Sequence, residues 1–531
     1  MRYTNHFNPN NTPQSEPIPF SGQVQNNAGG YAWQIDKWKR LERFLILGTE
    51  GGTYYTTERS LTVENAESAV ACLEEDPRRV VETLLDISRQ GRALKNGPAL
   101  FVLAMACSPL AVHSVEERAF ALGALPLVAR TPTHLFEFLE YVQDFRGWGR
   151  GLRRAVAEWY NHRSADVLAY HMVKYRQRNG WTNMDALRLA HPKASTEEHD
   201  IVYRWVVGKG RPESLPENVR IIEGFEKIQR VTDPSEAASL IREYSLPREA
   251  LPTSLLTEEA IWKALLPNMP VMALVRNLSN MARVGLIGPG RWENNERVVK
   301  VLNDPVLIRA SRIHPFQILM AMYGYGRGES RYGRGEWLVS GEIKNALEQA
   351  YYAAFENVKP TGKRICIGLD VSGSMSQSFG SSQDITCRDA SAALSMITVR
   401  TEPRTAVLAF EYALTPLDIG RQDSLEQVIH KVSNLRFGTT DCSLPMRYAY
   451  QHRLEFDAFV IYTDNETWAG PVHPAQALAQ YREKMGIDAK LVVVGMESNG
   501  FSIADPSDPG MLDVVGFDAN TPQVISEFIS L

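Results

Sequence analysis

Apolar residues recur with the period of an α-helix through most of the chain, from about 64 to 355. Positions i, i+3, i+4 and i+7 are apolar in the segments 78–90, 97–107, 116–129 and 133–143. A capping residue followed by proline separates these segments at Asp76-Pro77, Ser108-Pro109 and Thr131-Pro132. Short helices with short breaks predict a solenoid of HEAT-like repeats that curves or closes on itself. An irregular all-helical domain is the alternative that this pattern leaves open.

The pattern changes near residues 358–362, where short and wholly apolar segments begin to alternate with helical ones. We expect strands at 364–370, 405–410, 458–463 and 490–495. We expect helices at 386–400, 424–434, 443–452, 474–485 and 521–530. Apolar strands that alternate with helices are typical of a parallel sheet covered on both faces.

The chain is therefore predicted to have three parts. Residues 1–30 are rich in Asn, Pro, Gln, Ser and Gly and are expected to be disordered or loosely packed. Residues 31–361 are expected to form the domain of helical repeats. Residues 362–531 are expected to form an α/β doubly wound domain of the Rossmann type, in which ligands bind at the carboxyl ends of the strands.

Composition narrows the class of protein. With 44% hydrophobic and 22% charged residues, the chain is typical of a water-soluble globular protein. Its five cysteines never occur as C-x-x-C, which fits a reducing compartment and argues against a disulfide framework or a structural zinc site. The polar N-terminus lacks a signal peptide, and no segment approaches the roughly 18 apolar residues of a membrane span. We therefore expect a cytoplasmic protein with no membrane partner.

Charge is unevenly distributed along the chain. The residues from Arg364 onward hold 12 Lys and Arg against 21 Asp and Glu, whereas the preceding residues hold 45 against 41. Eight basic residues lie between Phe145 and Arg178, against only Glu158 and Asp166. They include Arg150, Arg153 and Arg154, and five Trp and Tyr side chains are interleaved with them. Basic and aromatic residues together suit RNA, although a solvated helix face is the competing interpretation.

On a continuous helix, His171, Lys174 and Arg178 would lie on one face, where they can follow a phosphate backbone. A second candidate for RNA contact is the Arg/Gly/Tyr-rich segment 323–335, because mobile loops of this composition suit single strands. A flexible linker between helices is the competing interpretation of that segment.

Three polar clusters occupy positions next to the predicted strands. Asp370-x-Ser372-x-Ser374 follows the first strand, Thr440 precedes a helix, and Asp464 follows the strand at 458–463. Hydroxyl and carboxylate oxygens suit a hard cation such as Mg²⁺. We expect Ser372, Ser374 and Thr440 to bind the metal directly, and the two aspartates to bind through water. Such an ion favours an acidic ligand from outside as its last partner. Helix caps with Asx turns would explain the first cluster without a metal.

These clusters resemble the metal-ion-dependent adhesion site of the von Willebrand factor A fold. Thr439 and Asn465 stand where that family commonly has glycine, which affects loop geometry but removes no ligand. In that family the site binds ligands and is not a hydrolytic centre.

The helical part resembles the Ro ribonucleoprotein family in long segments that begin at Gly147, Lys174, Leu187, Ile261 and Arg312. Pro360-Thr-Gly-Lys-Arg364, Thr440-Asp-Cys-Ser-Leu-Pro445 and Tyr462-Thr-Asp-Asn-Glu-Thr467 continue the resemblance in the α/β part. The resemblance implies a ring of HEAT-like repeats, the TROVE module, that closes near the A-type domain. The absence of secretory features and the length favour a bacterial member.

Members of that family bind small noncoding Y RNA on the outer basic face and single-stranded 3′ ends of misfolded or structured RNA in the hole. The bacterial members act with a 3′→5′ exoribonuclease such as polynucleotide phosphorylase, in RNA quality control, ribosomal RNA maturation and stress responses. By position in the matching segments, the resemblance assigns Y RNA binding to Lys174, Arg178 and His191, and less strongly to Arg153 and Arg154.

The leading hypothesis is thus an RNA-binding protein that is not an enzyme. A metal-dependent scaffold that binds other proteins without recognising RNA is the second. An enzyme that processes RNA with the metal is the weakest, because the sequence shows no paired carboxylates for a metal-activated water and no nucleophile with its base.

Overall fold

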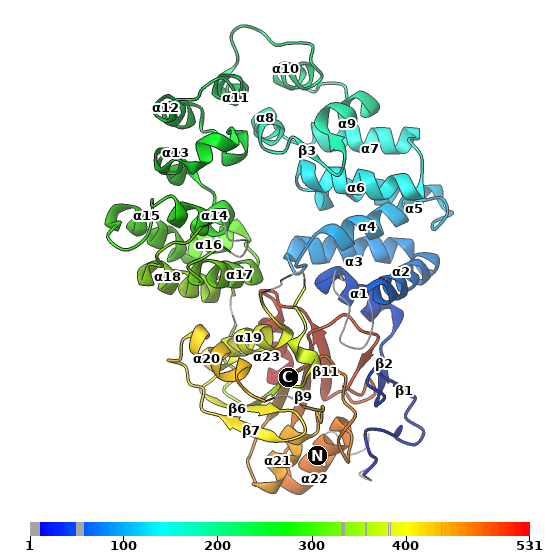
Figure 1. The fold of residues 1–531 in the computed structure, drawn as a ribbon. Helices are drawn as coiled ribbons and strands as arrows, with labels where there is room; N and C mark the ends of the chain where they lie inside the picture. Colours follow the sequence, from blue (N-terminus) through cyan, green and yellow to red (C-terminus); the bar gives the residue numbers. More distant parts are fainter. Residues whose placement is uncertain are drawn as a thin grey trace.

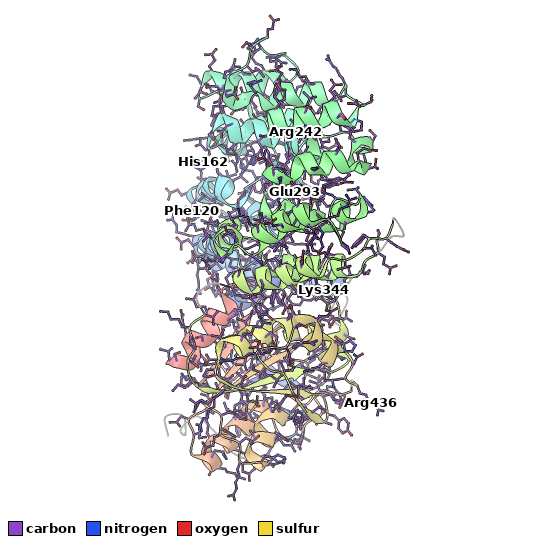
Figure 2. The ribbon with its side chains drawn as sticks, turned by 90° about the vertical axis from the view of Figure 1, so that its left-hand side faces the viewer. Phe120, His162, Arg242, Glu293, Lys344 and Arg436 are labelled. Atoms are coloured by element: carbon purple, nitrogen blue, oxygen red, sulfur yellow. The ribbon has the colours of Figure 1, made fainter. Side chains whose placement is uncertain are left out.

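The computed structural model describes residues 11–48, 58–330, 335–355, 358–380, 382, 384–436 and 438–531, with the backbone alone for residues 58–65. Two arms of helices rise from an α/β domain and meet at the far end, so that the helical part forms a ring (Figure 1). Viewed from the side, the helices are stacked above the α/β domain in a narrow layer (Figure 2). The predicted ring of helical repeats followed by an α/β domain is confirmed.

The helices of the first arm are α1 (Lys37–Leu47), α2 (Glu58–Glu75), α3 (Pro77–Gln90), α4 (Gly97–Ala106), α5 (Val115–Val128), α6 (Pro132–Phe145), α7 (Arg150–Asn161), α8 (Ala165–Lys174) and α9 (Asn183–Ala190). Four of the contacts join a helix to the helix two positions further along the chain: α3 to α5, α4 to α6, α5 to α7 and α7 to α9. Such a regular pairing buries one face of every helix against its neighbours.

The far end of the ring and the second arm complete the helical part. They consist of α10 (Glu197–Val206), α11 (Ile221–Ile228), α12 (Pro234–Tyr244), α13 (Glu259–Leu265), α14 (Val271–Arg283), α15 (Trp292–Leu302), α16 (Pro305–Ser311), α17 (Pro315–Gly326) and α18 (Gly341–Ala353). No helix among the described residues is long and apolar enough to cross a membrane.

Two of the three predicted cap-and-proline boundaries begin helices. The side chain of Asp76 accepts from the backbone N–H of Arg79, and that of Thr131 accepts from His134. The prediction at Ser108 is wrong, because no helix begins there: its hydroxyl accepts from the N–H of Leu110 at 3.0 Å within a turn and donates to the carbonyl of Phe145 at 2.9 Å. Helix α5 begins later and is capped by Ser114.

The α/β domain has a mixed sheet of six strands in the order β11-β9-β8-β5-β6-β7. The strands are β5 (Arg364–Asp370), β6 (Arg404–Phe410), β7 (Leu414–Leu417), β8 (Ala458–Thr463), β9 (Lys490–Gly495) and β11 (Met511–Val515). The helices are α19 (Cys387–Thr401), α20 (Leu425–Ser433), α21 (Leu444–Gln451), α22 (Pro474–Met485) and α23 (Thr521–Ser530). In the central pairs, Ile367 of β5 lies opposite Val407 of β6 and Val460 of β8.

Sequence patterns missed the two edge strands. β7 pairs antiparallel with β6, so the sheet is not wholly parallel. β11 pairs parallel with β9 but contains Asp513. Edge strands are only partly buried, and therefore lack the continuous apolar pattern by which the inner strands are recognised.

The segment that precedes α1 is ordered over residues 11–30, so the expectation of a disordered tail is wrong there; residues 1–10 lie outside the described residues. β1 (Gln23–Gln25), β2 (Tyr31–Gln34) and β10 (Phe501–Ser502) form a three-stranded antiparallel sheet that joins this segment to the α/β domain. Gln14 is wholly buried, at 0% exposure. Polar side chains order this segment through hydrogen bonds, which composition alone does not reveal.

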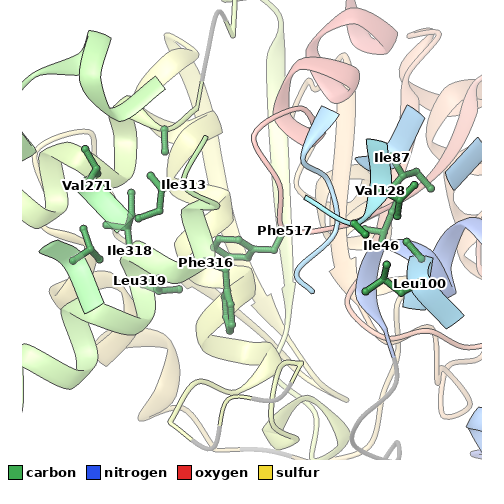
Figure 3. Close-up of a cluster of buried hydrophobic side chains, with 14 of the residues drawn as sticks. Ile46, Ile87, Leu100, Val128, Val271, Ile313, Phe316, Ile318, Leu319 and Phe517 are labelled. Carbon is green, nitrogen blue, oxygen red and sulfur yellow. The ribbon is translucent and has the colours of Figure 1, made fainter. Parts of the chain in front are cut away.

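Both arms of the ring contact the α/β domain. Arg43 of α1 is 1% exposed and donates to both carboxylate oxygens of Asp513 in β11, at 2.7 and 2.8 Å, and to the carbonyl of Phe501 at 3.0 Å. On the other arm, the ring of Phe316 in α17 packs against Phe517 at a centroid distance of 5.6 Å (Figure 3). One hydrophobic core runs through both arms and into the α/β domain.

Arg43→Ala is expected to destabilise the protein by about 3–5 kcal/mol, because it leaves the carboxylate of Asp513 buried without its cation. Urea unfolding followed by circular dichroism measures the loss. Lys39→Ala, at an exposed position of the same helix, is the matched control and is expected to change the free energy of unfolding little. An Arg43→Ala protein as stable as the control would show that this ion pair does not hold the arm.

Candidate metal centre and nucleic-acid interface

The carboxyl end of β5 carries the first polar cluster. Asp370, Ser372 and Ser374 are 0%, 1% and 2% exposed. The backbone N–H of Ser372 donates to Oδ1 of Asp370 at 2.9 Å, which forms the Asx turn of the alternative interpretation without a metal. The hydroxyls of Ser372 and Ser374 lie 3.1 Å apart. Two buried hydroxyls thus point to the same place beside a buried carboxylate.

The other two clusters meet the first one. Thr463, at the end of β8, donates its hydroxyl to Oδ2 of Asp370 at 2.6 Å, which places the neighbouring Asp464 beside the serines. The loop before α21 contacts the first cluster through Gly438, whose carbonyl accepts from the N–H of Gly373 at 3.3 Å. The same loop contains the buried Thr440. The structure therefore gathers the loops of all five predicted metal-site residues at one edge of the sheet, as adjacent parallel strands require.

Electrostatics make this site suitable for a cation. Burial raises the pKa of Asp370, and burial together with the charge of Asp370 raises the pKa of Asp464 to about 7. Oδ2 of Asp464 is buried and has no hydrogen-bond partner among the described residues. A divalent ion would satisfy that oxygen and neutralise both carboxylates. No trio of His, Cys, Asp or Glu suited to a metal occurs in the described part of the chain, so the hydroxyls would have to contribute.

Gln14 is a residue of this site that sequence analysis missed. Its Nε2 donates to Oδ1 of Asp441 at 2.7 Å, and its Oε1 accepts from the hydroxyl of Thr467. It therefore joins the loop of Thr440 to the loop of Asp464. Asn27 also donates to the carboxylate of Glu466 at 2.8 Å. The only sequence signal was a Gln-containing segment whose composition indicated disorder.

The basic stretch is presented by α7, α8 and the connection to α9. Arg150, Arg153 and Arg154 are exposed in the first turns of α7. Lys174, the last residue of α8, is partly buried, with its Nζ 5.3 Å from the ring centroid of Tyr170 and 5.4 Å from that of Tyr175. These aromatic contacts hold the ammonium group in place.

The prediction that His171, Lys174 and Arg178 share one helix face is wrong. The helix ends at Lys174, since Tyr175 has ψ 82°. Arg178 belongs to β3 (Gln177–Arg178), which pairs with β4 (Trp181–Thr182). Asn179 and Gly180 both have positive φ, 51° and 75°, which forms the tight hairpin turn that exposes Arg178.

The two histidines of the predicted interface differ. Burial, with the charges of Arg163 and Lys174, lowers the pKa of His171 to about 4, so this ring is neutral at pH 7 and adds no charge. His191 is exposed and follows α9 with a left-handed φ of 50°, its N–H donating to the carbonyl of Leu187. Of the two, only His191 presents an accessible ring.

Like charges face each other between the arms. Arg130 lies between α5 and α6 of one arm, and Arg312 lies between α16 and α17 of the other (Figure 1). Burial and the charge of Arg312 lower the pKa of Arg130. The charges of Arg130 and Arg163 likewise lower the pKa of His134, after burial, to about 4. Because the two arginines lie far apart in the sequence, no motif indicated them.

The Arg/Gly/Tyr-rich segment 323–335 does not begin as a free loop. Residues 323–326 belong to α17, and the buried hydroxyl of Tyr325 accepts from the N–H of Ser340 at 2.9 Å. The indole of Trp337 donates to the carbonyl of Tyr325 at 2.9 Å. Residues 331–334, which include Arg331 and Arg334, lie outside the described residues.

Comparison with known proteins gives consistent matches. The family model of the TROVE domain matches residues 24–210 and 242–324, and that of the Ro60 vWA domain matches residues 364–529. The chain is 41% identical over 523 residues to the RNA-binding protein RO60 of Deinococcus radiodurans, covering 98% of each chain. It is 35% identical over 585 residues to the RNA-binding protein RO60 of Caenorhabditis elegans, covering 96% of this chain and 90% of that protein.

The crystal structure of the Deinococcus radiodurans Ro (RSR) protein is similar to this one with a TM-score of 0.72 and 40% identity, covering 93% of this chain and 99% of that chain. A ring of helical repeats standing on a von Willebrand factor A-like domain defines the class of this protein. The chain belongs to the Ro ribonucleoprotein (Ro60) family.

Proposed function

We propose that this protein binds RNA without catalysing its conversion, at two places on the ring. The outer basic face, made of Arg150, Arg153, Arg154, Lys174, Arg178 and His191, takes the stem of a small noncoding Y RNA. The hole takes the single-stranded 3′ end of a misfolded or structured RNA. The observation that carries the proposal is the like charge of Arg130 and Arg312 between the arms, neither of which has an ion-pair partner among the described residues, supported by relatives named RNA-binding proteins.

On the outer face, the chemistry suits a double-stranded stem. The exposed arginines of α7 and Arg178 at the hairpin tip can contact phosphates independently of sequence. Proteins recognise A-form RNA mainly by its shape, phosphates and 2′-hydroxyls, because its major groove is too narrow for side chains.

In the hole, the repulsion between two arginines favours the binding of a polyanion. Arg130 and Arg312 repel each other across the arms, and a phosphate between them would turn that repulsion into attraction. Arg163 continues the positive charge, with its guanidinium held by the carbonyl of Ala129 at 2.8 Å. A passage lined with cations suits the phosphate backbone of a single strand.

In a bacterial cytoplasm we propose that such a protein presents the trapped 3′ end to a 3′→5′ exoribonuclease such as polynucleotide phosphorylase, in RNA quality control, ribosomal RNA maturation and stress responses. The exoribonuclease can reach the 3′ end only if the RNA strand passes through the hole of the ring. Chemistry on the RNA would then belong to the partner enzyme.

Replacing both Lys174 and Arg178 by Ala is expected to weaken Y RNA binding by tenfold or more and to reduce the slope of log K against log[salt] by about two, because each lost phosphate contact removes about one. Gel shifts at several salt concentrations measure both quantities. The matched control replaces Lys263 and Lys300, exposed on the opposite arm, by Ala. Equal affinity and equal slope in the two double variants would contradict the assignment.

Replacing Arg130 and Arg312 by Ala is expected to abolish the preference for an RNA hairpin with a single-stranded 3′ extension over the same hairpin without one. Binding of Y RNA should stay unchanged, since neither residue lies on the outer face. Competition between the two hairpins measures the effect. A preference that survives in the double variant would place the single strand elsewhere.

A second role concerns the α/β domain. We propose that Ser372, Ser374 and Thr440 bind Mg²⁺ directly, with Asp370 and Asp464 acting through water. An acidic ligand from a partner protein completes the shell, as electron-poor hydroxyl coordination favours. The support is the buried oxygen of Asp464 that lacks a partner among the described residues. This docking role is compatible with RNA binding on the ring.

Mg²⁺ is expected to raise the unfolding temperature of the wild-type protein, because it binds the folded state alone. Asp464→Asn should abolish the rise. Gln14→Ala, which leaves every proposed ligand in place, should reduce it by freeing the two ligand loops, whereas Gln25→Ala at an exposed position of the same segment should not. Thermal scans with MgCl₂ and with chelator measure these shifts. A wild-type protein indifferent to the metal would contradict the site.

A further inference from the structure

A cavity of about 490 Å³ lies at the far end of the ring from the α/β domain. Its walls come from α8, from the segment before α11, and from the C-terminal end of α12 through α13 to α14 (Figure 1). Its volume is within the range of pockets that hold small molecules. Lys174, a proposed contact for RNA, lines it.

Two of the three cations that line the cavity have acidic neighbours. Arg220 lies 3.1 Å from a carboxylate oxygen of Glu217 and 3.5 Å from one of Glu243. Burial lowers the pKa of Lys174, but the nearby Tyr170, Tyr175 and Glu249 raise it overall. Since four carboxylates line the cavity against three cations, the interior does not favour a phosphate. It suits a neutral ligand with polar edges.

Flat surfaces line two sides of the cavity. Tyr170 of α8 is partly exposed. On the other side, the guanidinium of Arg220 lies over the ring of Tyr244, with Cζ 5.1 Å from its centroid, and one third of the Arg220 side chain is exposed. Aromatic rings and guanidinium planes are the surfaces on which proteins stack unpaired bases.

A buried polar atom of the lining lacks a partner. Nε of Arg248 is buried and has no acceptor among the described residues. Buried donors without partners are uncommon, and a bound group is one explanation for such a donor.

We propose that the cavity binds one unpaired base of the RNA that the ring holds. The base stacks on Tyr170 or on the guanidinium of Arg220, and its phosphate stays outside, near Lys174. The carboxylates of Asp166 and Glu249, which line the same space, accept from an exocyclic amino group. The site therefore favours adenine, cytosine and guanine over uracil. The inference rests on the proposed binding of RNA and adds a base preference to it.

Short homopolymers of adenylate, cytidylate and uridylate test the inference by fluorescence anisotropy. Adenylate and cytidylate should bind the wild-type protein on the order of tenfold more tightly than uridylate. Ala273→Trp, which fills the cavity from α14, should reduce both to the affinity of uridylate and leave uridylate unchanged. Met272→Trp, at the neighbouring position that does not line the cavity, should keep the preference.

A second variant controls for a misfolded Ala273→Trp protein. Asp166→Asn combined with Glu249→Gln keeps the volume of the cavity and removes its charged acceptors, so it should also lower the preference for amino bases. Equal affinities for the three homopolymers in the wild type, or a preference kept by both variants, would overturn the inference. A protein that binds none of them overturns the proposed function as well.

The remaining outcome concerns an organic cation. The acidic groups can also attract a polyamine, so adenosine monophosphate and spermidine are each added alone in thermal scans. A shift with adenosine monophosphate that Ala273→Trp abolishes supports the inference. A shift with spermidine only would assign the cavity to a polyamine and overturn it.

Discussion

One turn after β11 contacts both arms of the ring and so constrains the whole helical part. Gly516 has φ 120°, and a Cβ there would lie 2.5 Å from Oδ2 of Asp518. Phe517 packs against Phe316 of the second arm at 5.6 Å and against Phe379 of the α/β domain at 5.8 Å. Asp518 pairs at 3.4 Å with Arg92, which follows α3 of the first arm. Repeats that contact only their neighbours form an open solenoid. Phe517 and Asp518 are adjacent in the sequence and bind opposite arms, so this turn joins the two ends of the solenoid.

The position of the proposed metal-binding loops could be predicted from the sequence because it follows from a topological rule. Asp370 ends β5 and Asp464 directly follows β8, and side chains at the carboxyl ends of these adjacent parallel strands must converge. The prediction that His171, Lys174 and Arg178 lie on one helix face was wrong because it assumed an unbroken helix. Tyr175 leaves the helical conformation, and the Asn179-Gly180 turn follows directly. The arginines between the arms could not be found, because only the curvature of the whole solenoid brings them together.

The N-terminal segment shows a different limit of sequence reasoning. Low apolar content argues for disorder when order must come from hydrophobic burial. Here the surface of the α/β domain orders the segment. Gln14 donates to the carboxylate of Asp441 at 2.7 Å, and Asn26 donates to the carbonyl of Thr467 at 2.8 Å. A buried amide that satisfies its hydrogen bonds costs little, whereas an unsatisfied one is strongly unfavourable. Such order depends on a partner hundreds of residues away, so no local pattern predicts it.

Asn499 contacts both the ring and the proposed metal site. Asn499 accepts from Nη1 of Arg43 in α1 through its side chain at 2.6 Å and its carbonyl at 3.0 Å. The same Asn499 donates its Nδ2 to the backbone carbonyl of Asp464. The first helix of the ring is therefore one hydrogen-bonded residue from a proposed metal ligand. If α1 could occupy two positions and the metal bound more tightly in one of them, the metal would favour that position by the same free energy, because linkage is reciprocal. The α/β domain thus closes the ring at its base, and the site proposed for a metal lies within reach of the same helix.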